Sequence, residues 1–100
     1  MANTKVEFLV SAPAGMDLYI CGNTTSLGDW DAAKAVKLAF CDECKKYTAS
    51  KLLPAGEQIE FKVLSAKNWD AVEKGAHHED VANHSFTAAK GAKVEVKVQF

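Results

Sequence analysis

Short runs in which apolar and polar side chains alternate predict an all-β fold for this chain of 100 residues. A period of two is typical of strands that bury one face, and turn residues such as Pro54 and Gly56 separate the runs. No stretch keeps the 3.6-residue period of an amphipathic helix over four turns. These observations predict seven or eight short antiparallel strands that form a β-sandwich or a partly open barrel.

Each expected strand places its apolar residues on one face. The alternation is clearest near the end of the chain, where Val94, Val96 and Val98 share a face and charged residues occupy the positions between them. The expected strands are residues 5–10, 17–21, 35–40, 47–53, 58–64 and 92–100.

Two longer segments lack this alternation. Residues 23–34 are polar and rich in turn formers, such as Ser26 and Asp29, whose side chains hydrogen-bond local backbone. Residues 70–83 are also polar. Their first part, 70–74, fits one helical turn or a short strand, and we favour a strand followed by a long loop.

The charge of the chain is nearly balanced, with 12 Lys and Arg residues, 13 Asp and Glu residues and a formal net charge of -1. This balance argues against binding to nucleic acid or to an anionic membrane through bulk positive charge. No apolar run approaches the roughly 20 residues that cross a bilayer. We therefore expect one globular domain over residues 1–100, a monomer with no nucleic-acid and no membrane partner.

The first residues do not form a secretory signal, because the short apolar stretch after Lys5 is broken by Glu7. Three cysteines, an odd number, do not describe a disulfide framework, and we expect reduced thiols. The compartment stays open, since a complete protein of this kind would be cytoplasmic and a fragment of a secreted glycosidase extracellular.

The two tryptophans lie in polar surroundings. Trp30 ends the motif SLGDWD at residues 26–31, and Trp69 stands between Asn68 and Asp70. An exposed indole can stack on the apolar face of a pyranose ring, while neighbouring polar side chains reach the sugar hydroxyls. Alternatively, each ring folds inward and caps the core.

Several motifs, in order along the chain, resemble the starch-binding domain known as carbohydrate-binding module family 20. They are DLYICGN at 17–23, SLGDWD at 26–31, AVKL at 35–38, LPAG at 53–56, IEFKV at 59–63 and, less closely, residues 72–73, 83 and 86–87. The resemblance covers nearly the whole chain. It implies an antiparallel immunoglobulin-like β-sandwich, an open-sided distorted β-barrel of seven or eight strands. It also implies binding of α-1,4-linked glucans such as starch, glycogen and maltooligosaccharides.

The resemblance also implies a set of site residues. Trp30 matches the first stacking tryptophan of the family, and Lys62 matches a lysine that hydrogen-bonds sugar hydroxyls. The family's second tryptophan falls on Lys74, and Trp69, five residues earlier, would have to take its place. Asn83 falls near the family's asparagine ligand. The expected carbohydrate-binding residues are Trp30, Lys62, Trp69, Glu73 and Asn83.

Members of this family often have a second sugar site built from tyrosines. Tyr19 matches one of these tyrosines, whereas Tyr47 matches a structural aromatic residue. The loop that carries the other tyrosine is short in this chain, so we expect no second site.

A CxxC motif at Cys41 and Cys44 opens a metal-binding alternative. Two thiolates with two of His77, His78 and His84 would form a tetrahedral zinc site, although the histidine spacing fits poorly. A solvated hairpin turn explains the motif better. We also expect no redox role, because the motif does not open a helix that would lower a thiol pKa.

We expect no catalytic activity. The acidic residues are scattered, and a small β-domain has little material for the deep cleft in which a glycosidase distorts its substrate. The sequence has no nucleophile elbow, phosphate-binding glycine loop or HExxH motif. We therefore expect a non-catalytic glucan-binding module that needs no cofactor and is linked to a catalytic domain such as an amylase.

Two other classes of protein fit the same residues. One is a β-sandwich that docks a protein partner with its tryptophans as interface anchors. The other is the small zinc-binding domain described above.

Overall fold

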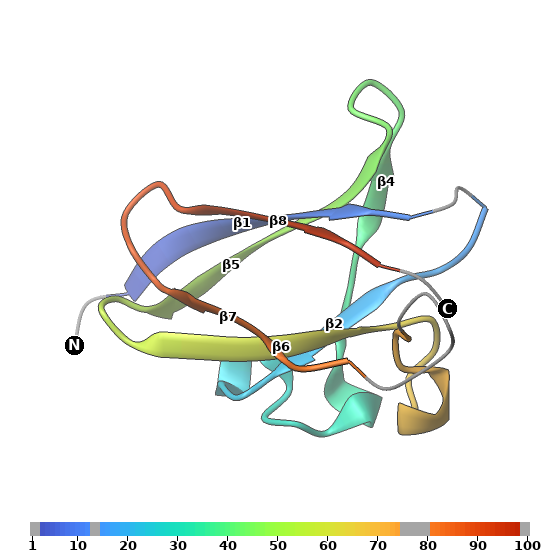
Figure 1. The fold of residues 1–100 in the computed structure, drawn as a ribbon. Helices are drawn as coiled ribbons and strands as arrows, with labels where there is room; N and C mark the ends of the chain where they lie inside the picture. Colours follow the sequence, from blue (N-terminus) through green and yellow to red (C-terminus); the bar gives the residue numbers. More distant parts are fainter. Residues whose placement is uncertain (1–2, 13–14, 75–80, 99–100) are drawn as a thin grey trace.

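Two four-stranded sheets pack face to face in the computed structural model of the chain, which describes residues 3–12, 15–74 and 81–98 (Figure 1). The first sheet has the order β4-β5-β1-β8 and the second the order β3-β2-β6-β7. The strands are β1 (Asn3–Ser11), β2 (Tyr19–Gly22), β3 (Val36–Lys37), β4 (Ala39–Cys41), β5 (Lys46–Pro54), β6 (Gln58–Leu64), β7 (His84–Thr87) and β8 (Lys93–Lys97). The predicted all-β sandwich is confirmed.

The strand pairing is antiparallel with one exception. β1 runs antiparallel to β5, from the pair Asn3 and Pro54 to the pair Val10 and Tyr47. β8 instead runs parallel to β1, with Lys97 opposite Ser11. The first and last strands are therefore neighbours in the same sheet.

The core fills the space between the sheets. Phe8 of β1 and Phe61 of β6 are fully buried there and meet edge to face, with ring centroids 5.2 Å apart. Burial of a side chain of this size contributes about 1.5–3 kcal/mol. The other core residues are Val6, Val10, Leu18, Ile20, Leu27, Leu38, Tyr47, Leu53, Ile59, Val63, Ala88 and Val98.

The segment 35–40, which we predicted as one strand, is divided between the two sheets. β3 pairs with β2 of the second sheet, and β4 pairs with β5 of the first. Between them the Leu38 N–H donates to the Leu18 carbonyl over 2.8 Å, and the Leu38 side chain is buried. The alternation is real, but the chain changes sheets at Leu38.

Three 3-10 turns interrupt the two polar segments. They are η1 (Thr25–Leu27), η2 (Ala32–Lys34) and η3 (Trp69–Ala71). The strand expected over 70–74 is therefore wrong at its start, and its later part forms isolated bridges, among them the one between Val72 and Leu64. These turns are too short to cross a membrane, and the described part of the chain contains no helix that could do so.

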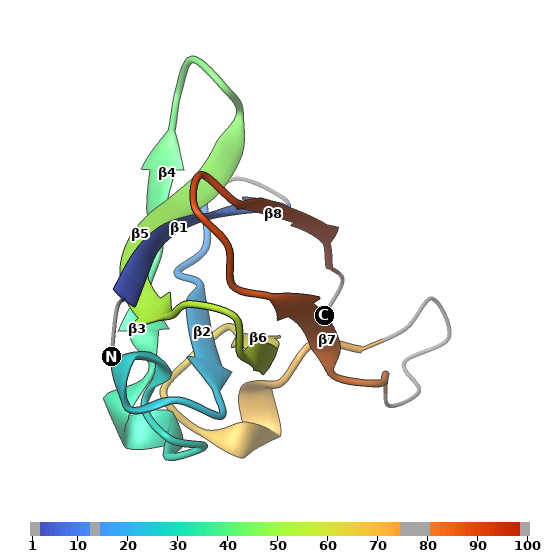
Figure 2. The same cartoon turned by 90° about the vertical axis from the view of Figure 1, so that its left-hand side faces the viewer.

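The turns η2 and η3 both lie below β2 and β6 in Figure 1 and Figure 2. The outer face of the second sheet is covered in this region, because Cys21 and Leu64 are buried in a second apolar cluster with Ala32 and Ala35. The loops that carry the two tryptophans thus meet on one face of the second sheet.

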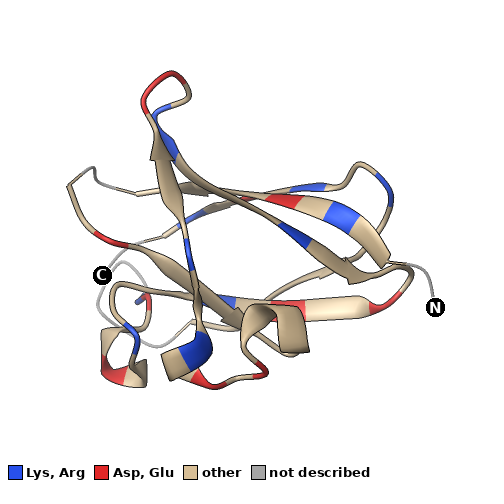
Figure 3. Cartoon of the chain, turned by 180° about the vertical axis from the view of Figure 1, so that it is seen from behind, with Lys and Arg blue, Asp and Glu red and all other residues tan. Residues whose placement is uncertain are grey.

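Lysines and acidic residues are interspersed over both sheets instead of forming one patch of a single sign (Figure 3). This distribution agrees with the near-neutral charge of the sequence.

Two adjacent leucines of β5 provide a test of the burial pattern. Leu53 is fully buried, whereas Leu52 is 57% exposed. We expect Leu53→Ala to lower the free energy of unfolding by about 2–5 kcal/mol, because it removes core contacts and leaves a cavity. Leu52→Ala should change it by less than about 0.5 kcal/mol. Urea denaturation of both variants checks this, and similar losses for the two would contradict the assigned strand register.

Candidate functional site

The loop from β2 to β3 holds Trp30 through its backbone. The Trp30 N–H donates to the Gly22 carbonyl over 2.8 Å, and the Asp29 N–H donates to the Thr24 carbonyl over 2.8 Å. Gly28, Asp29 and Trp30 all have positive φ angles, of 88°, 51° and 62°. Two successive non-glycine residues in this region are unusual, and such backbone often occurs at functional sites.

Trp69 lies beside Trp30 although 39 residues separate the two in sequence. Its indole Nε1–H donates to the Trp30 carbonyl over 3.2 Å. The ring centroids are 6.0 Å apart, and the ring planes are tilted by 42°. Trp69 is 39% exposed, and neither indole is part of the core clusters. The two rings therefore form an accessible aromatic pair.

Lys62 stands on the same face of the second sheet. Lys62 pairs with Cys21 of β2. The residue after Cys21 is Gly22, and the Gly22 carbonyl accepts the hydrogen bond from the Trp30 N–H. Lys62 is half-buried, and within the described residues its ammonium group has no ion-pair partner. Its three N–H bonds are thus available as hydrogen-bond donors.

Asn83 is exposed and immediately precedes β7. The next residue, His84, pairs with Phe61, and Phe61 immediately precedes Lys62. This register places Asn83 at the end of β7 that adjoins Lys62. Its amide group offers both donors and an acceptor.

Glu73 differs from the other expected site residues because its side chain is only 3% exposed. One carboxylate oxygen, Oε2, accepts from the Val63 N–H over 2.6 Å, and Oε1 lies 2.6 Å from His84 Nε2. The Glu73 N–H also donates to the Val63 carbonyl over 2.8 Å. A covered carboxylate with a partner on each oxygen holds its own segment against β6 and β7. Because both oxygens are occupied, we do not propose Glu73 as a sugar contact.

The two tyrosines differ in environment. Tyr47 is buried, and its hydroxyl accepts a hydrogen bond from the Met16 N–H over 3.3 Å, which agrees with a structural role. Tyr19 is half-buried, and the Lys67 ammonium lies 5.9 Å from its ring centroid.

Cys41 and Cys44 form a disulfide, so the expectation of reduced thiols is wrong for this pair. Of the three histidines in the zinc alternative, His84 is engaged with Glu73, while His77 and His78 lie outside the described residues. Where the structure describes the chain, it contains no group of three or more His, Cys, Asp or Glu side chains that could hold a metal.

Cys21 is the remaining cysteine, and it is fully buried beneath the Trp30 loop. Burial, and to a lesser extent the charge of Asp31, raises the pKa of its thiol. The thiol is therefore protonated at neutral pH and shielded from solvent.

Two contacts of the site were missed in the sequence. The Trp30 carbonyl as acceptor for Trp69 has no sequence signal, because any residue carries a carbonyl. The pairing of Glu73 with His84 has a weak sequence signal, because His84 is a polar residue at an alternating position of a strand. Neither of these two contacts could be predicted before the register of β6 and β7 was known.

A β-sandwich with an accessible aromatic pair, a lysine and an amide on one face is the arrangement of a carbohydrate-binding module. The sequence profile of the family described as starch binding domain matches residues 3–98, and the chain belongs to this family. The predicted family is confirmed.

Relatives and solved structures agree with this assignment. A cyclomaltodextrin glucanotransferase of Bacillus sp. (strain 17-1) is 29% identical over 102 aligned positions, which cover 96% of this chain and 14% of that enzyme. A glucan 1,4-alpha-maltotetraohydrolase of Stutzerimonas stutzeri is 32% identical over 78 positions, which cover 78% of this chain and 14% of the enzyme. The chain thus spans about one seventh of the length of these relatives.

The fold is similar to that of the family 20 carbohydrate-binding module of a maltotetraose-forming amylase from Pseudomonas saccharophila STB07. The TM-score is 0.71 and the identity 28%, with 94% of this chain and 99% of that module covered. A glucoamylase structure from Hormoconis resinae also has a TM-score of 0.71, at 25% identity, and the match covers 96% of this chain and 17% of the enzyme.

The buried Glu73 generates a test of how the site is held. Glu73→Ala leaves the Val63 N–H and His84 without their partner, so we expect the free energy of unfolding to fall by about 3 kcal/mol. Glu57→Ala, at an exposed glutamate in the turn before β6, should change it by less than about 0.5 kcal/mol. Urea denaturation followed by tryptophan fluorescence measures both, and equal effects would refute the assigned role of Glu73.

Proposed function

We propose that Trp30 and Trp69 form the platform on which this starch-binding domain stacks α-1,4-linked glucans such as starch, glycogen and maltooligosaccharides. The observation that carries the proposal is the aromatic pair, with ring centroids 6.0 Å apart and a tilt of 42°. Tilted planes suit successive sugar rings of a chain that curves, as helical α-glucans do. Flat faces of the pyranose rings would replace water on the indoles.

Polar groups beside the platform would orient the sugar. Lys62 of β6 and Asn83, which immediately precedes β7, are neighbours in the register, and their ammonium and amide groups would hydrogen-bond the 2-, 3- and 6-hydroxyls of one or two glucose units. Glu73 would act behind them, by holding the segment that carries Trp69 against β6.

The arrangement supports binding without catalysis. An open aromatic platform holds a sugar from one side and does not enclose a bond to be broken. We propose that residues 1–100 act as one monomeric binding domain, and that it serves a catalytic domain such as an amylase. The support for this setting is that the matched relatives are enzymes several times longer than this chain.

A single site of this kind should be weak. Each stacked ring contributes on the order of 1–3 kcal/mol, and ordering the ligand offsets part of this gain. We therefore expect dissociation constants in the micromolar-to-millimolar range, of roughly 10⁻⁶ to 10⁻³ M. On an insoluble polymer, several weak attachments would act together.

Removal of one indole tests the platform. We expect Trp69→Ala to weaken β-cyclodextrin binding about tenfold or more, because one stacking surface worth roughly 1.4 kcal/mol or more is lost. Trp30→Ala should weaken it at least as much. Titrations followed by NMR shifts measure the affinities, and urea denaturation verifies that the variants fold.

Leu52→Ala is the control for this experiment, because Leu52 is exposed on the first sheet, away from the platform. It should bind as the unaltered chain does. A β-1,4-linked oligosaccharide should bind much more weakly than maltoheptaose. No response of the unaltered chain to maltoheptaose at millimolar concentration would refute the proposal.

The ammonium of Lys62 can be tested apart from its aliphatic stem. Lys62→Met keeps the length and the apolar atoms but removes the donors. We expect about a fivefold loss of β-cyclodextrin affinity, equivalent to roughly 1 kcal/mol for one hydrogen bond. Lys97→Met on β8 of the first sheet is the matched control. Isothermal titration calorimetry compares the two, and equal affinities would remove Lys62 from the site.

A further inference from the structure

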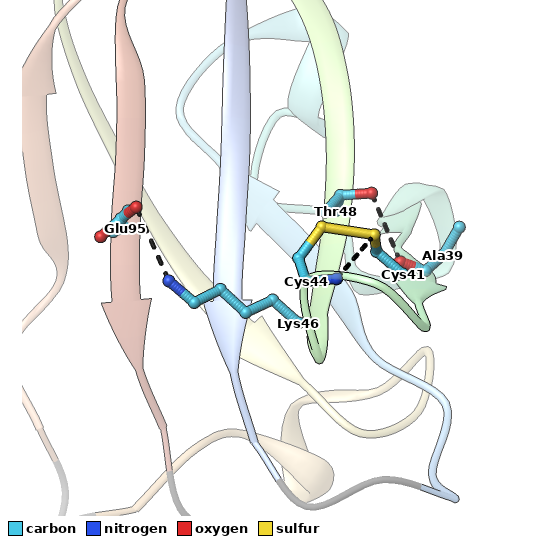
Figure 4. The surroundings of a disulfide bond; sticks show 6 residues. All are labelled: Ala39, Cys41, Cys44, Lys46, Thr48 and Glu95. Carbon is cyan, nitrogen blue, oxygen red and sulfur yellow. Dashed lines mark hydrogen bonds and ion pairs between the residues drawn. A yellow bond between two sulfur atoms is a disulfide. The ribbon is translucent and has the colours of Figure 1, made fainter.

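The disulfide lies in the turn of the β4–β5 hairpin, which extends beyond the two packed sheets in Figure 1 and Figure 2. Figure 4 shows the two sulfur atoms at the turn of the hairpin, with Lys46 extending away from them toward Glu95 of β8, where Nζ and Oε1 are 3.6 Å apart. Cys41 opens the turn opposite Lys46, and the turn residues 42–45 are exposed.

This disulfide is not needed to close the hairpin. Cys41 pairs with Lys46 in the ladder, and the Lys45 N–H donates to the Cys41 carbonyl over 2.8 Å. The bond joins cysteines only three positions apart. Because the entropy that a disulfide removes from the unfolded chain grows with the length of the enclosed loop, such a short loop gains little. The bond can therefore open without loss of the fold.

The two sulfur atoms are not equivalent. Cys44 is exposed, whereas Cys41 is half-buried. The Cys44 N–H donates to Cys41 Sγ over 3.2 Å, a contact drawn in Figure 4. A hydrogen bond to sulfur favours its thiolate form, and in disulfide exchange the better-stabilised thiolate leaves faster. An incoming nucleophile thus finds the accessible sulfur on Cys44 and the better leaving group on Cys41.

We propose that the Cys41–Cys44 hairpin is a thiol–disulfide exchange site that reacts with low-molecular-weight thiols. A thiolate RS⁻ attacks Cys44 Sγ and forms a mixed disulfide there, while the electron pair of the broken S–S bond leaves on Cys41 Sγ. A second RS⁻ attacks the R-group sulfur, releases RSSR and frees the Cys44 thiolate. Both protein thiolates then take protons from solvent. The net reaction is one protein disulfide and two RSH giving one protein dithiol and RSSR.

Two features define the conditions for this chemistry. No helix N-terminus is present at the CxxC motif, and the backbone N–H of Cys44 supplies the stabilisation that a helix would give elsewhere. The exposed Asp42 and Glu43 carboxylates lie at the hairpin tip, which is red in Figure 3. They repel thiols that carry a further negative charge besides the reacting thiolate. An uncharged thiol is therefore the suitable probe.

Exchange on the folded, full-length chain can be followed with 2-mercaptoethanol. We expect an acid-quenched sample to contain a mixed disulfide on Cys44, located by fragment mass spectrometry. At longer times, iodoacetamide should label both Cys41 and Cys44 but leave the buried Cys21 unmodified. Labelling that requires urea, or an adduct found on Cys41 instead, would overturn the proposal.

Single-cysteine variants test the inequivalence of the sulfurs. In Cys44→Ser the backbone N–H of residue 44 is kept, so the Cys41 thiol should reach its half-maximal rate of alkylation at a lower pH than the Cys44 thiol does in Cys41→Ser. Equal or reversed profiles would refute the assigned leaving group.

Reduction should leave the rest of the molecule unchanged. The hairpin extends away from the turns that carry the tryptophans (Figure 1), so the far-UV circular dichroism and the β-cyclodextrin affinity of the reduced chain should match those of the oxidised chain within twofold. Unfolding on reduction would show that the bond is a structural staple and contradict the proposal. Because the redox measurement needs no sugar, its outcome is independent of the glucan site.

Discussion

The hydrogen bond from the Trp69 indole to the Trp30 carbonyl is the interaction on which the aromatic pair depends. It joins two loops that are distant in sequence, and it fixes one ring through the backbone of the other. Trp30 is itself tied to Gly22 at the end of β2. The second sheet thus determines the position of both rings through these hydrogen bonds. A surface organised before the ligand arrives avoids much of the ordering cost of association.

This organisation carries a local cost. Asp29 and Trp30 occupy left-handed backbone, which for non-glycine residues costs on the order of 1–2 kcal/mol each. The hydrogen bonds from Asp29 to Thr24 and from Trp30 to Gly22 offset it. On the other side of the pair, the covered Glu73 carboxylate holds the Trp69 segment to β6. The aromatic pair therefore relies on backbone hydrogen bonds in one loop and on a buried carboxylate behind the other.

The sequence predicts a strand well where all residues of an alternating segment belong to the same sheet. Residues 58–64 coincide with β6, but 35–40 divides at Leu38, because alternation does not reveal which sheet a strand joins. The expected pairing of Trp30 with Trp69 rested on a family resemblance and on their polar neighbours. The burial of Glu73 was not predictable in this way, since a glutamate in a polar segment normally faces water and His84 is 11 residues away. The spacing of Cys41 and Cys44 likewise fits a disulfide, a metal site or free thiols.

The parallel pairing of β8 with β1 determines how the domain would sit within a longer polypeptide. β8 adjoins the second half of β1, and Lys97 lies opposite Ser11, at the far end of that strand from Asn3. The entry to β1 and the exit from β8 are consequently separated by about 26 Å, the span of eight strand residues. Segments joined at these two points would therefore leave the first sheet at opposite ends and not side by side.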